Sequence, residues 1–269
     1  MPEGHTLHRL ARDHTDLFAG RRVAVSSPQG RFAAEAARVD GLVFERAEAW
    51  GKHLWHHYTP DRRGAAAPIV HVHLGLYGTF TDFDRPEPPV GQVRMRIAGP
   101  DGGTDLRGPT ACELVTEEQV DAVLARLGPD PLRSDADPEA AWRRISKSAR
   151  PIGALLMDQK VIAGVGNVYR AEVLFRAGID PYRPGRAVTR EEFDALWADL
   201  VALMPIGVER GRMHVVRAEH DHGAPSYAPD RPRTYVYRRA GEPCRVCGRP
   251  VVTEVMDARN LFRCPTCQT

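Results

Sequence analysis

The sequence predicts an α+β protein with three parts in chain order: a β-rich domain, a helical domain and a short cysteine-rich hairpin. Residues 20–116 contain alternating and extended apolar runs separated by glycines, which is typical of strands. Residues 117–213 place apolar residues at helical spacing behind helix-capping sequences. Four of the five cysteines fall near the C-terminus. We therefore expect domains at 1–116, 117–233 and 234–269, the second of which includes a linker.

Composition and the chain start exclude two classes of protein. The 269 residues are 42% hydrophobic and 27% charged, which is ordinary for a globular protein and argues against global disorder. No apolar run approaches the roughly 18 residues that a membrane span needs. The first residues have neither the basic nor the apolar region of a signal peptide. We therefore expect a cytoplasmic protein without a membrane partner.

The first part is expected to begin with a helix and continue as strands. Apolar residues recur at helical spacing over residues 3–19. The segments 22–26 and 93–97 alternate apolar and polar residues, which indicates half-buried strands. Further extended runs with glycine punctuation cover 42–58 and 69–80.

Capping sequences divide the second part into helices. Thr116–Gln119 is a capping box, and Asp137 followed by Pro138 combines an N-cap with a first-turn proline. Thr189–Glu192 is a second capping box, and the helix behind it has an apolar face. That face consists of Phe193, Leu196, Trp197, Leu200 and Leu203. Residues 219–233, rich in Pro, Asp, His and Arg, indicate a loop or linker.

The formal net charge is +2, but its distribution along the chain is uneven. From Pro205 onward the chain has eleven Arg, no Lys and seven acidic residues, so the remainder is net negative. Positive charge concentrated toward the C-terminus suits a phosphate-rich partner. A solvated basic face explains the same pattern, so charge alone leaves both readings open.

The C-terminal cysteines form two Cys-x2-Cys pairs separated by sixteen residues. This is the spacing of a four-thiolate zinc site, in which a hairpin brings the second pair of sulfurs back to the first. Residues 250–256 are rich in strand formers and residues 257–260 resemble a turn. Two disulfides are the alternative, and disulfides are rare in cytosolic proteins. We expect one structural Zn²⁺ held by Cys244, Cys247, Cys264 and Cys267.

A glycine-containing turn precedes a helix in the second part. Gly164 and Gly166 permit a tight turn and leave its surface without side chains. Asn167 then opens a helix whose first amides point outward, and helix N-termini bind phosphates. The alternative is an ordinary corner between two helices with a capping asparagine.

Pro2 follows the initiator methionine, and a small second residue generally permits removal of Met1. The exposed secondary amine would have a pKa near 7.7–8.0, far below that of lysine. It would be substantially unprotonated at neutral pH and able to attack carbon. Glu3 beside it can transfer protons. Many proteins begin Met-Pro without using the proline, and a retained Met1 would block the amine.

Taken together, these motifs resemble the formamidopyrimidine-DNA glycosylase/endonuclease VIII family, and most closely an actinobacterial endonuclease VIII-type enzyme. The matching motifs occur in the family's order over essentially the whole chain. They are Pro2–Gly4, Gly51–Leu54, His73–Gly78, Leu127–Leu132, Gly164–Glu172, Tyr235–Arg238 and Cys264–Gln268.

The resemblance implies both a fold and a reaction. The implied fold is an N-terminal β-sandwich flanked by helices, a helix–two-turn–helix domain and a zinc-finger β-hairpin. The implied protein is a bifunctional DNA glycosylase/AP lyase of base excision repair that removes oxidised bases, pyrimidines rather than purines. Its partner would be double-stranded DNA with a damaged base or an abasic site. A monomer associated with the nucleoid in the bacterial cytoplasm is expected.

The resemblance also assigns roles to single residues. Pro2 resembles the nucleophile that forms a Schiff base with C1′ of the damaged nucleotide, and Glu3 resembles its acid/base partner. Lys52 resembles a hairpin lysine that meets a phosphate near the lesion and is needed for activity. Asn167 resembles the turn residue that holds a backbone phosphate, and Arg259 the zinc-finger arginine that clamps the flanking phosphates. β-Elimination and δ-elimination would then cut the strand.

A flipped-out base leaves a hole that the family fills with an inserted wedge. Leu76 and Tyr77 are the candidates for this role. The endonuclease VIII branch uses a Gln-Leu-Tyr wedge, and Gly75 occupies the Gln position here. The other branch takes wedge residues from a later loop, and the corresponding residues 105–110 lack its aromatic residue. Leu76 as a core strand residue is the alternative.

Three other functions compete with the leading one. A zinc-dependent protein could bind damaged DNA without catalysing a reaction. A purine-directed glycosylase would act on formamidopyrimidine or 8-oxoguanine. A proline-based tautomerase of small molecules would not need the zinc hairpin, the phosphate-binding turn or Lys52.

Overall fold

The chain forms two compact units, Met1–Arg126 and Leu127–Thr269. The computed structural model describes residues 2–61, 64, 66–85, 87–223 and 231–269. Among these residues, no helix combines the length and apolar character that crossing a membrane requires.

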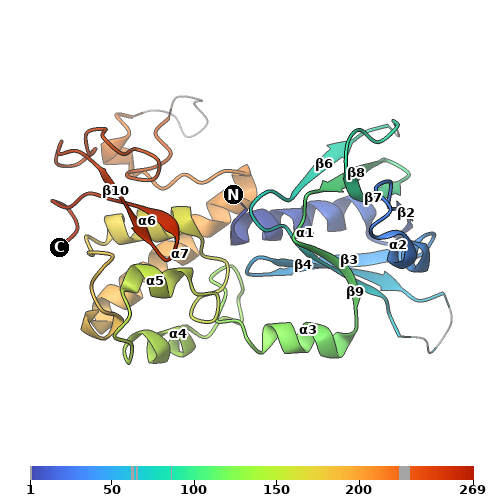
Figure 1. Cartoon of the computed structure of the whole chain (residues 1–269), viewed down its shortest axis with the longest axis horizontal. Coiled ribbons are helices and arrows are strands. Elements are labelled where there is room, and N and C mark those ends of the chain that lie inside the picture. The colour runs from blue at the N-terminus through green and yellow to red at the C-terminus, as the bar shows by residue number, and fades with distance from the viewer. Residues whose placement is uncertain (1, 62–63, 65, 86, 224–230) are drawn as a thin grey trace. The chain divides into compact units, whose positions relative to one another are not determined.

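Two antiparallel sheets form the centre of the first unit (Figure 1). The first sheet has the order β1-β3-β4-β5-β9, and the second has the order β2-β7-β8-β6. The strands of the first sheet are β1 (Arg21–Arg22), β3 (Val43–Trp50), β4 (His53–Thr59), β5 (Ile69–His73) and β9 (Ala111–Val115). Those of the second are β2 (Ala24–Ser26), β6 (Thr79–Phe83), β7 (Val93–Gly99) and β8 (Gly102–Arg107).

One apolar core joins the two sheets and the first helix, α1 (Gly4–Phe18). Phe44 and Leu54 from the first sheet and Ile97 from the second are fully buried in it. Phe18 of α1 meets Phe44 with ring centroids 5.5 Å apart. The implied β-sandwich flanked by helices is therefore confirmed. The helix α3 (Glu117–Leu124), which our sequence-based boundary assigned to the second domain, belongs to this unit.

One helix of the first unit was missed by the sequence analysis. Residues 20–116 were expected to be extended, but α2 (Ala33–Val39) lies within them. Four of its seven residues are alanine, the strongest helix former. The segment is too short to show helical periodicity, so only this composition could have revealed it.

The second unit contains four α-helices over its described residues: α4 (Pro138–Ile145), α5 (Ile152–Met157), α6 (Asn167–Arg176) and α7 (Arg190–Arg210). Short 3-10 helices cover Gly185–Ala187 and Ala218–His220. The capping boxes at Thr116 and Thr189 and the N-cap at Asp137 are confirmed. The predicted loop 219–233 includes residues 224–230, which lie outside the described part of the chain.

The C-terminal hairpin pairs β10 (Val252–Met256) with β11 (Arg259–Arg263). Its turn is shorter than the predicted turn over 257–260. Only Asp257 and Ala258 form it, with φ of 49° and 58°. Two residues with positive φ make a turn whose twist matches that of paired strands. Arg259 is therefore the first strand residue after the turn.

Candidate functional site

The N-terminus begins directly at the first helix. Glu3 is the N-cap of α1 and is fully buried, whereas Pro2 is partly exposed. The Glu3 carbonyl accepts a hydrogen bond from the Thr6 amide at 2.8 Å. Met1 lies outside the described residues, so its removal stays a prediction.

Lys52 lies in the two-residue turn between β3 and β4. Trp50 and His53 pair across this turn, and Gly51 has φ +58°. Positive φ favours glycine, and here it closes the tight turn that presents the partly exposed Lys52. The structure thus gives Lys52 the hairpin position that the family resemblance implied.

Two contacts fix how α1 lies along β3. The Ala47 amide donates to Thr15 Oγ1 at 2.9 Å, and the Gly20 amide donates to the Phe44 carbonyl at 2.9 Å. From Thr15 back to Glu3 the helix runs about 18 Å. From Ala47 forward to the turn the strand runs about 14 Å. The start of α1 and the turn between β3 and β4 therefore lie at the same end of the first unit (Figure 1). Pro2, Glu3 and Lys52 share this end.

The loop after β5 reaches the same end. His53 pairs with His73, so the end of β5 adjoins the Lys52 turn. The loop then exposes Leu76 by 49% and Tyr77 by 86%. The alternative interpretation of Leu76 as a core strand residue is therefore wrong. An exposed leucine and tyrosine on one loop have the chemistry of an inserted wedge.

The structure explains why this loop lacks the family's glutamine. Gly75 has φ +66°, a conformation that side chains rarely adopt. A Cβ atom at this position would lie 1.9 Å from Thr110 Oγ1. A glutamine would therefore need both the backbone and Thr110 to move, so Leu76 and Tyr77 alone stay candidates for a wedge.

A chain of local hydrogen bonds joins histidines on the strands behind Lys52, as expected for strand histidines rather than for a second metal site. His53 Nδ1 lies 2.9 Å from His71 Nε2, and His71 Nδ1 lies 3.1 Å from Glu113 Oε1. The Trp55 ring stacks on both imidazoles. Burial, followed by the neighbouring histidines, lowers the pKa of His53 to about 3. Histidines at alternating positions of paired strands were the available signal.

In the second unit, one side chain braces the turn before α6. Gln159 Oε1 accepts from the Gly164 amide at 3.0 Å, and its Nε2 donates to the Val165 carbonyl at 2.9 Å. The Gly128 amide donates to the Gln159 carbonyl at 2.9 Å. A Cβ at Gly128 would approach the Val161 carbonyl to 2.4 Å. Two motifs distant in sequence therefore pack together only because this residue is glycine.

Asn167 links this turn to the C-terminal hairpin. It is the first residue of α6, and its side chain donates from Nδ2 to the Asn260 carbonyl at 2.9 Å. Arg170 donates to the same carbonyl at 3.1 Å. Arg259 precedes Asn260 and is exposed. Asn167 and Arg259, predicted as phosphate contacts, are thus neighbours, although Asn167 itself is only 5% exposed.

The four C-terminal cysteines converge as predicted. Their sulfur atoms all lie within 4.8 Å of one another, with Cys244 Sγ to Cys267 Sγ at 3.8 Å and Cys247 Sγ to Cys264 Sγ at 3.5 Å. Zinc–thiolate bonds of about 2.3 Å in a tetrahedron require sulfur separations of about 3.8 Å. The donor set therefore fits one structural Zn²⁺. Because protein fills all four positions, this ion would stabilise the hairpin rather than bind a substrate.

Glu172 anchors the segment that leads into the hairpin, a role that its motif did not reveal. Its buried carboxylate accepts hydrogen bonds from the backbone amides of Tyr235 at 2.6 Å, Val236 at 3.0 Å and Tyr237 at 2.8 Å. Three donors satisfy a charge that would otherwise be costly to bury. The hairpin is thereby tied to α6 at both Asn167 and Glu172.

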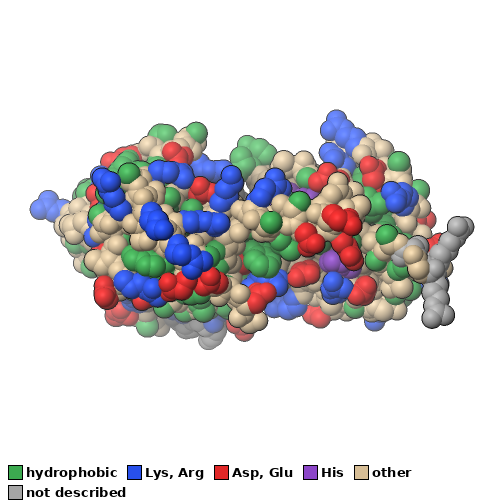
Figure 2. Space-filling view, turned by 90° about the horizontal axis from the view of Figure 1, so that it is seen from below, with side chains coloured by type: hydrophobic (Ala, Val, Ile, Leu, Met, Phe, Trp, Pro, Cys, Tyr) green, Lys and Arg blue, Asp and Glu red, His purple; other side chains and the backbone are tan. Residues whose placement is uncertain are grey.

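Basic side chains are not confined to the C-terminal region. Figure 2 shows Lys and Arg side chains gathered over the half of the molecule that holds the second unit. The exposed residues of this unit include Arg143, Arg144, Lys147, Arg150 and Lys160, most of them in or after α4. The positive surface therefore extends to residues that precede the C-terminal charge surplus.

Three family models match successive parts of the chain. They are the formamidopyrimidine-DNA glycosylase N-terminal domain over residues 1–108, its H2TH domain over 127–218, and the zinc finger found in FPG and IleRS over 241–269. A β-sandwich unit, a helical unit and a four-thiolate hairpin in this order define the class of H2TH DNA glycosylases.

Individual proteins agree with these models. A Mycobacterium tuberculosis protein named Endonuclease 8 1 is 65% identical over 274 residues, covering 100% of both chains. The crystal structure of the MutM (Fpg) protein from Thermus thermophilus is 30% identical, with TM-score 0.77 and 99% and 98% coverage. A Lactococcus lactis Fpg complex with DNA containing an abasic site shares the fold at 19% identity, with TM-score 0.80 and 99% coverage of both chains. The chain belongs to the formamidopyrimidine-DNA glycosylase/endonuclease VIII family of DNA glycosylases/AP lyases.

Proposed function

We propose that this DNA repair glycosylase removes oxidised bases, pyrimidines in preference to purines, and then cuts the strand by β,δ-elimination. The observation that carries this proposal is that Pro2, Glu3, Lys52 and the loop with Leu76 and Tyr77 share one end of the first unit. The 65% identity to a protein named Endonuclease 8 1 supports the pyrimidine preference, since the match to the MutM (Fpg) structure is much weaker.

The chemistry begins at the Pro2 amine. Its lone pair forms a bond to C1′, and the electrons of the N-glycosidic bond leave with the base, which takes up the proton that the amine loses. Glu3 donates a proton to the sugar-ring oxygen as the ring opens to an iminium ion. The positive iminium acidifies the C2′ proton. Its loss expels the 3′ phosphate, a second elimination expels the 5′ phosphate, and water releases Pro2.

The remaining residues hold the substrate, which is double-stranded DNA with a damaged base or an abasic site. Lys52 contacts a phosphate near the lesion, and Asn167 and Arg259 contact backbone phosphates. Leu76 and Tyr77 fill the space left by the extruded base, which lowers the cost of unstacking. The protein acts as a monomer at the nucleoid of the bacterial cytoplasm.

Borohydride trapping tests the reaction directly, because reduction makes the iminium adduct permanent. Purified protein, shown by intact mass to lack Met1, is mixed with labelled duplexes containing an abasic site, an oxidised pyrimidine or 8-oxoguanine. We expect adducts with the abasic site and the oxidised pyrimidine and weaker trapping with 8-oxoguanine. Pro2→Gly should abolish them, and Lys52→Ala should reduce them while DNA binding largely survives.

Pro28→Gly is the matched control, because it changes an exposed proline in a turn of the same unit. It should trap like the wild type. Stronger trapping with 8-oxoguanine would replace the pyrimidine assignment by the purine-directed one. Binding without any adduct would leave a zinc-dependent damaged-DNA-binding protein as the function.

A further inference from the structure

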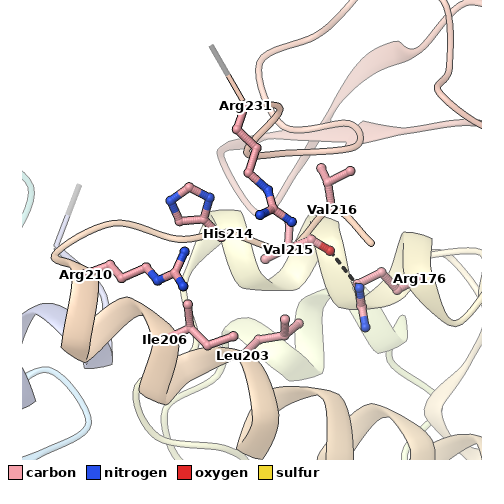
Figure 3. Close-up of a pocket in the computed structure, with 8 residues that line it drawn as sticks. All are labelled: Arg176, Leu203, Ile206, Arg210, His214, Val215, Val216 and Arg231. Atoms are coloured by element: carbon pink, nitrogen blue, oxygen red, sulfur yellow. Dashed lines mark hydrogen bonds between the residues drawn. The ribbon is translucent and has the colours of Figure 1, made fainter. Parts of the chain in front are cut away.

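A cavity of about 270 Å³ lies within the second unit, and its lining includes none of the zinc-site cysteines and no residue of the turn before α6 (Figure 3). Side chains from α6, α7 and the segment after α7 surround it. One wall is apolar and consists of Leu203, Ile206, Val215 and Val216. The rest of the lining is three arginines and one histidine. A cavity with an apolar wall and convergent polar groups has the form of a small-molecule site.

His214 is the least satisfied group in this lining. It is only 7% exposed, and neither ring nitrogen has a hydrogen-bond partner among the described residues. An unpaired buried polar atom costs about 1–3 kcal/mol. Burial, and then the surrounding arginines, lower the pKa of His214, so the neutral ring offers one N–H donor and one lone pair. The missing partner is therefore expected inside the cavity.

The charges around His214 favour an anion as that partner. The guanidinium groups of Arg210 and Arg231 line the cavity around its ring (Figure 3), and those of Arg212 and Arg233 also act on it. Arg231 Nε is buried and has no hydrogen-bond partner in the described part of the chain.

Two carboxylates offset part of this positive charge. Asp221 pairs with Arg231 at 2.5 Å, and Asp199 accepts two bonds of 2.7 Å from Arg176, the fifth arginine near the cavity. Arg212 and Arg233 act on His214 besides these two ion pairs, so the cavity carries a net positive potential.

We propose that this cavity binds a small phosphate-bearing anion. Its oxygens would accept hydrogen bonds from the His214 N–H and from the guanidinium groups of Arg210 and Arg231. Its carbon-bearing part would pack on the apolar wall. The volume is slightly below the usual range of about 300–1,000 Å³, so it suits a phosphate with at most a small attached group. This site goes beyond the proposed reaction and requires nothing of Pro2.

Protonation of His214 should strengthen binding. An anion beside His214 favours its protonated form, so the bound state has the higher pKa and takes up a proton on binding. The protonation of His214 is influenced by the charged groups around it, which are Arg176, Arg210, Arg212, Arg231, Arg233, Asp199 and Asp221. None of these changes charge near neutral pH, but phosphate itself does, so the difference in pH dependence between the wild type and His214→Leu reports His214.

Calorimetric titration of the full-length zinc-loaded protein with sodium orthophosphate, at constant ionic strength, tests the proposal. We expect one site per chain, with an affinity that rises relative to that of His214→Leu as the pH is lowered. His214→Leu should weaken binding about tenfold or more, as loss of a hydrogen bond to a charged group predicts. Arg210→Gln, at an exposed position, should weaken it too. Arg12→Gln, an exposed arginine of α1, should bind like the wild type.

Absence of phosphate binding by the wild type would overturn the proposal. So would equal binding by the wild type, His214→Leu and Arg210→Gln. Two competitors identify the natural source of the phosphate. Displacement of orthophosphate by a deoxynucleoside 5′-monophosphate supports a free nucleotide. Displacement by an undamaged duplex, but not by the nucleotide, supports a backbone phosphate of DNA.

Discussion

At the residue scale, the loop that carries Leu76 and Tyr77 depends on a glycine. Gly75 has a positive φ, and its Cα lies so close to the Thr110 side chain that a Cβ atom would overlap Thr110 Oγ1. Neither constraint involves the side chains of Leu76 and Tyr77, the proposed wedge residues. The loop therefore packs without a side chain at position 75, because Thr110 occupies the space that such a side chain would need.

Two variants separate the cost of the positive φ from the cost of the contact with Thr110. They are Gly75→Ala and Gly91→Ala. Gly91 also has positive φ, at +74°, but a Cβ atom there would have no neighbour within 4 Å among the described residues. We expect Gly91→Ala to lower the free energy of unfolding by about 1–2 kcal/mol and Gly75→Ala to lower it by more. Urea unfolding measures both. Adding Thr110→Gly should recover most of the difference, and no recovery would show that Thr110 is not the obstacle.

At the element scale, the zinc hairpin and α6 form one assembly. Asn167 and Glu172 bind backbone groups on either side of the first cysteine pair, at sequence separations of 93 and 63 residues. The hairpin itself is short, and a two-stranded hairpin is marginally stable in water. The metal, these two anchors and the apolar contacts of Leu261 and Phe262 with the helices therefore supply its stability.

Removal of zinc by a chelator should unfold the hairpin and leave the sandwich folded. The two parts have separate apolar clusters, so loss of one does not expose the other. Hydrogen exchange should show β10 and β11 losing protection while β4 and β5 keep theirs. Cys247→Ser should lower the zinc content, whereas Cys112→Ser in β9 should not. Unchanged protection of β10 and β11 would contradict a stabilising role for the metal.

At the scale of the whole molecule, buried histidines make stability depend on pH. His14 Nδ1 and His56 Nε2 lie 3.0 Å apart in the core of the first unit. Burial lowers the pKa of His14, and that of His5, to about 4, and lowers the pKa of His56 well below 6.5. Below pH 6.5 these histidines bind protons in the unfolded chain but stay neutral in the folded chain. Stability is therefore full above pH 6.5 and is lost as the pH falls toward 4.

Urea unfolding at about pH 7.5 and about pH 5.5 measures this loss, to which each such histidine contributes up to about 1.4 kcal/mol per pH unit below 6.5. The double variant His14→Leu/His56→Leu should show a smaller loss than the wild type. His8→Leu, on the partly exposed face of α1, should leave the loss unchanged. A double variant with the wild-type pH dependence would rule out this histidine pair as the cause.

Much of the fold could be predicted because its signals are local. The capping boxes at Thr116 and Thr189 act within four residues, and the spacing of the cysteines encodes a zinc hairpin directly. The family resemblance supplied the sandwich and the candidate site, whose individual residues stay predictions. The helix α2 was not predicted, because its seven residues contain no complete periodic pattern.

The sequence by itself determined the order of the parts, the metal ligands and the family. Only the tertiary structure decided which loops share an end of the first unit, why Gly75 excludes a side chain, and that His214 faces a cavity with no partner among the described residues. The physical reason is the range of the interactions. Helix caps and metal spacing depend on near neighbours, whereas registers, close approaches and unpaired groups depend on residues that only folding brings together.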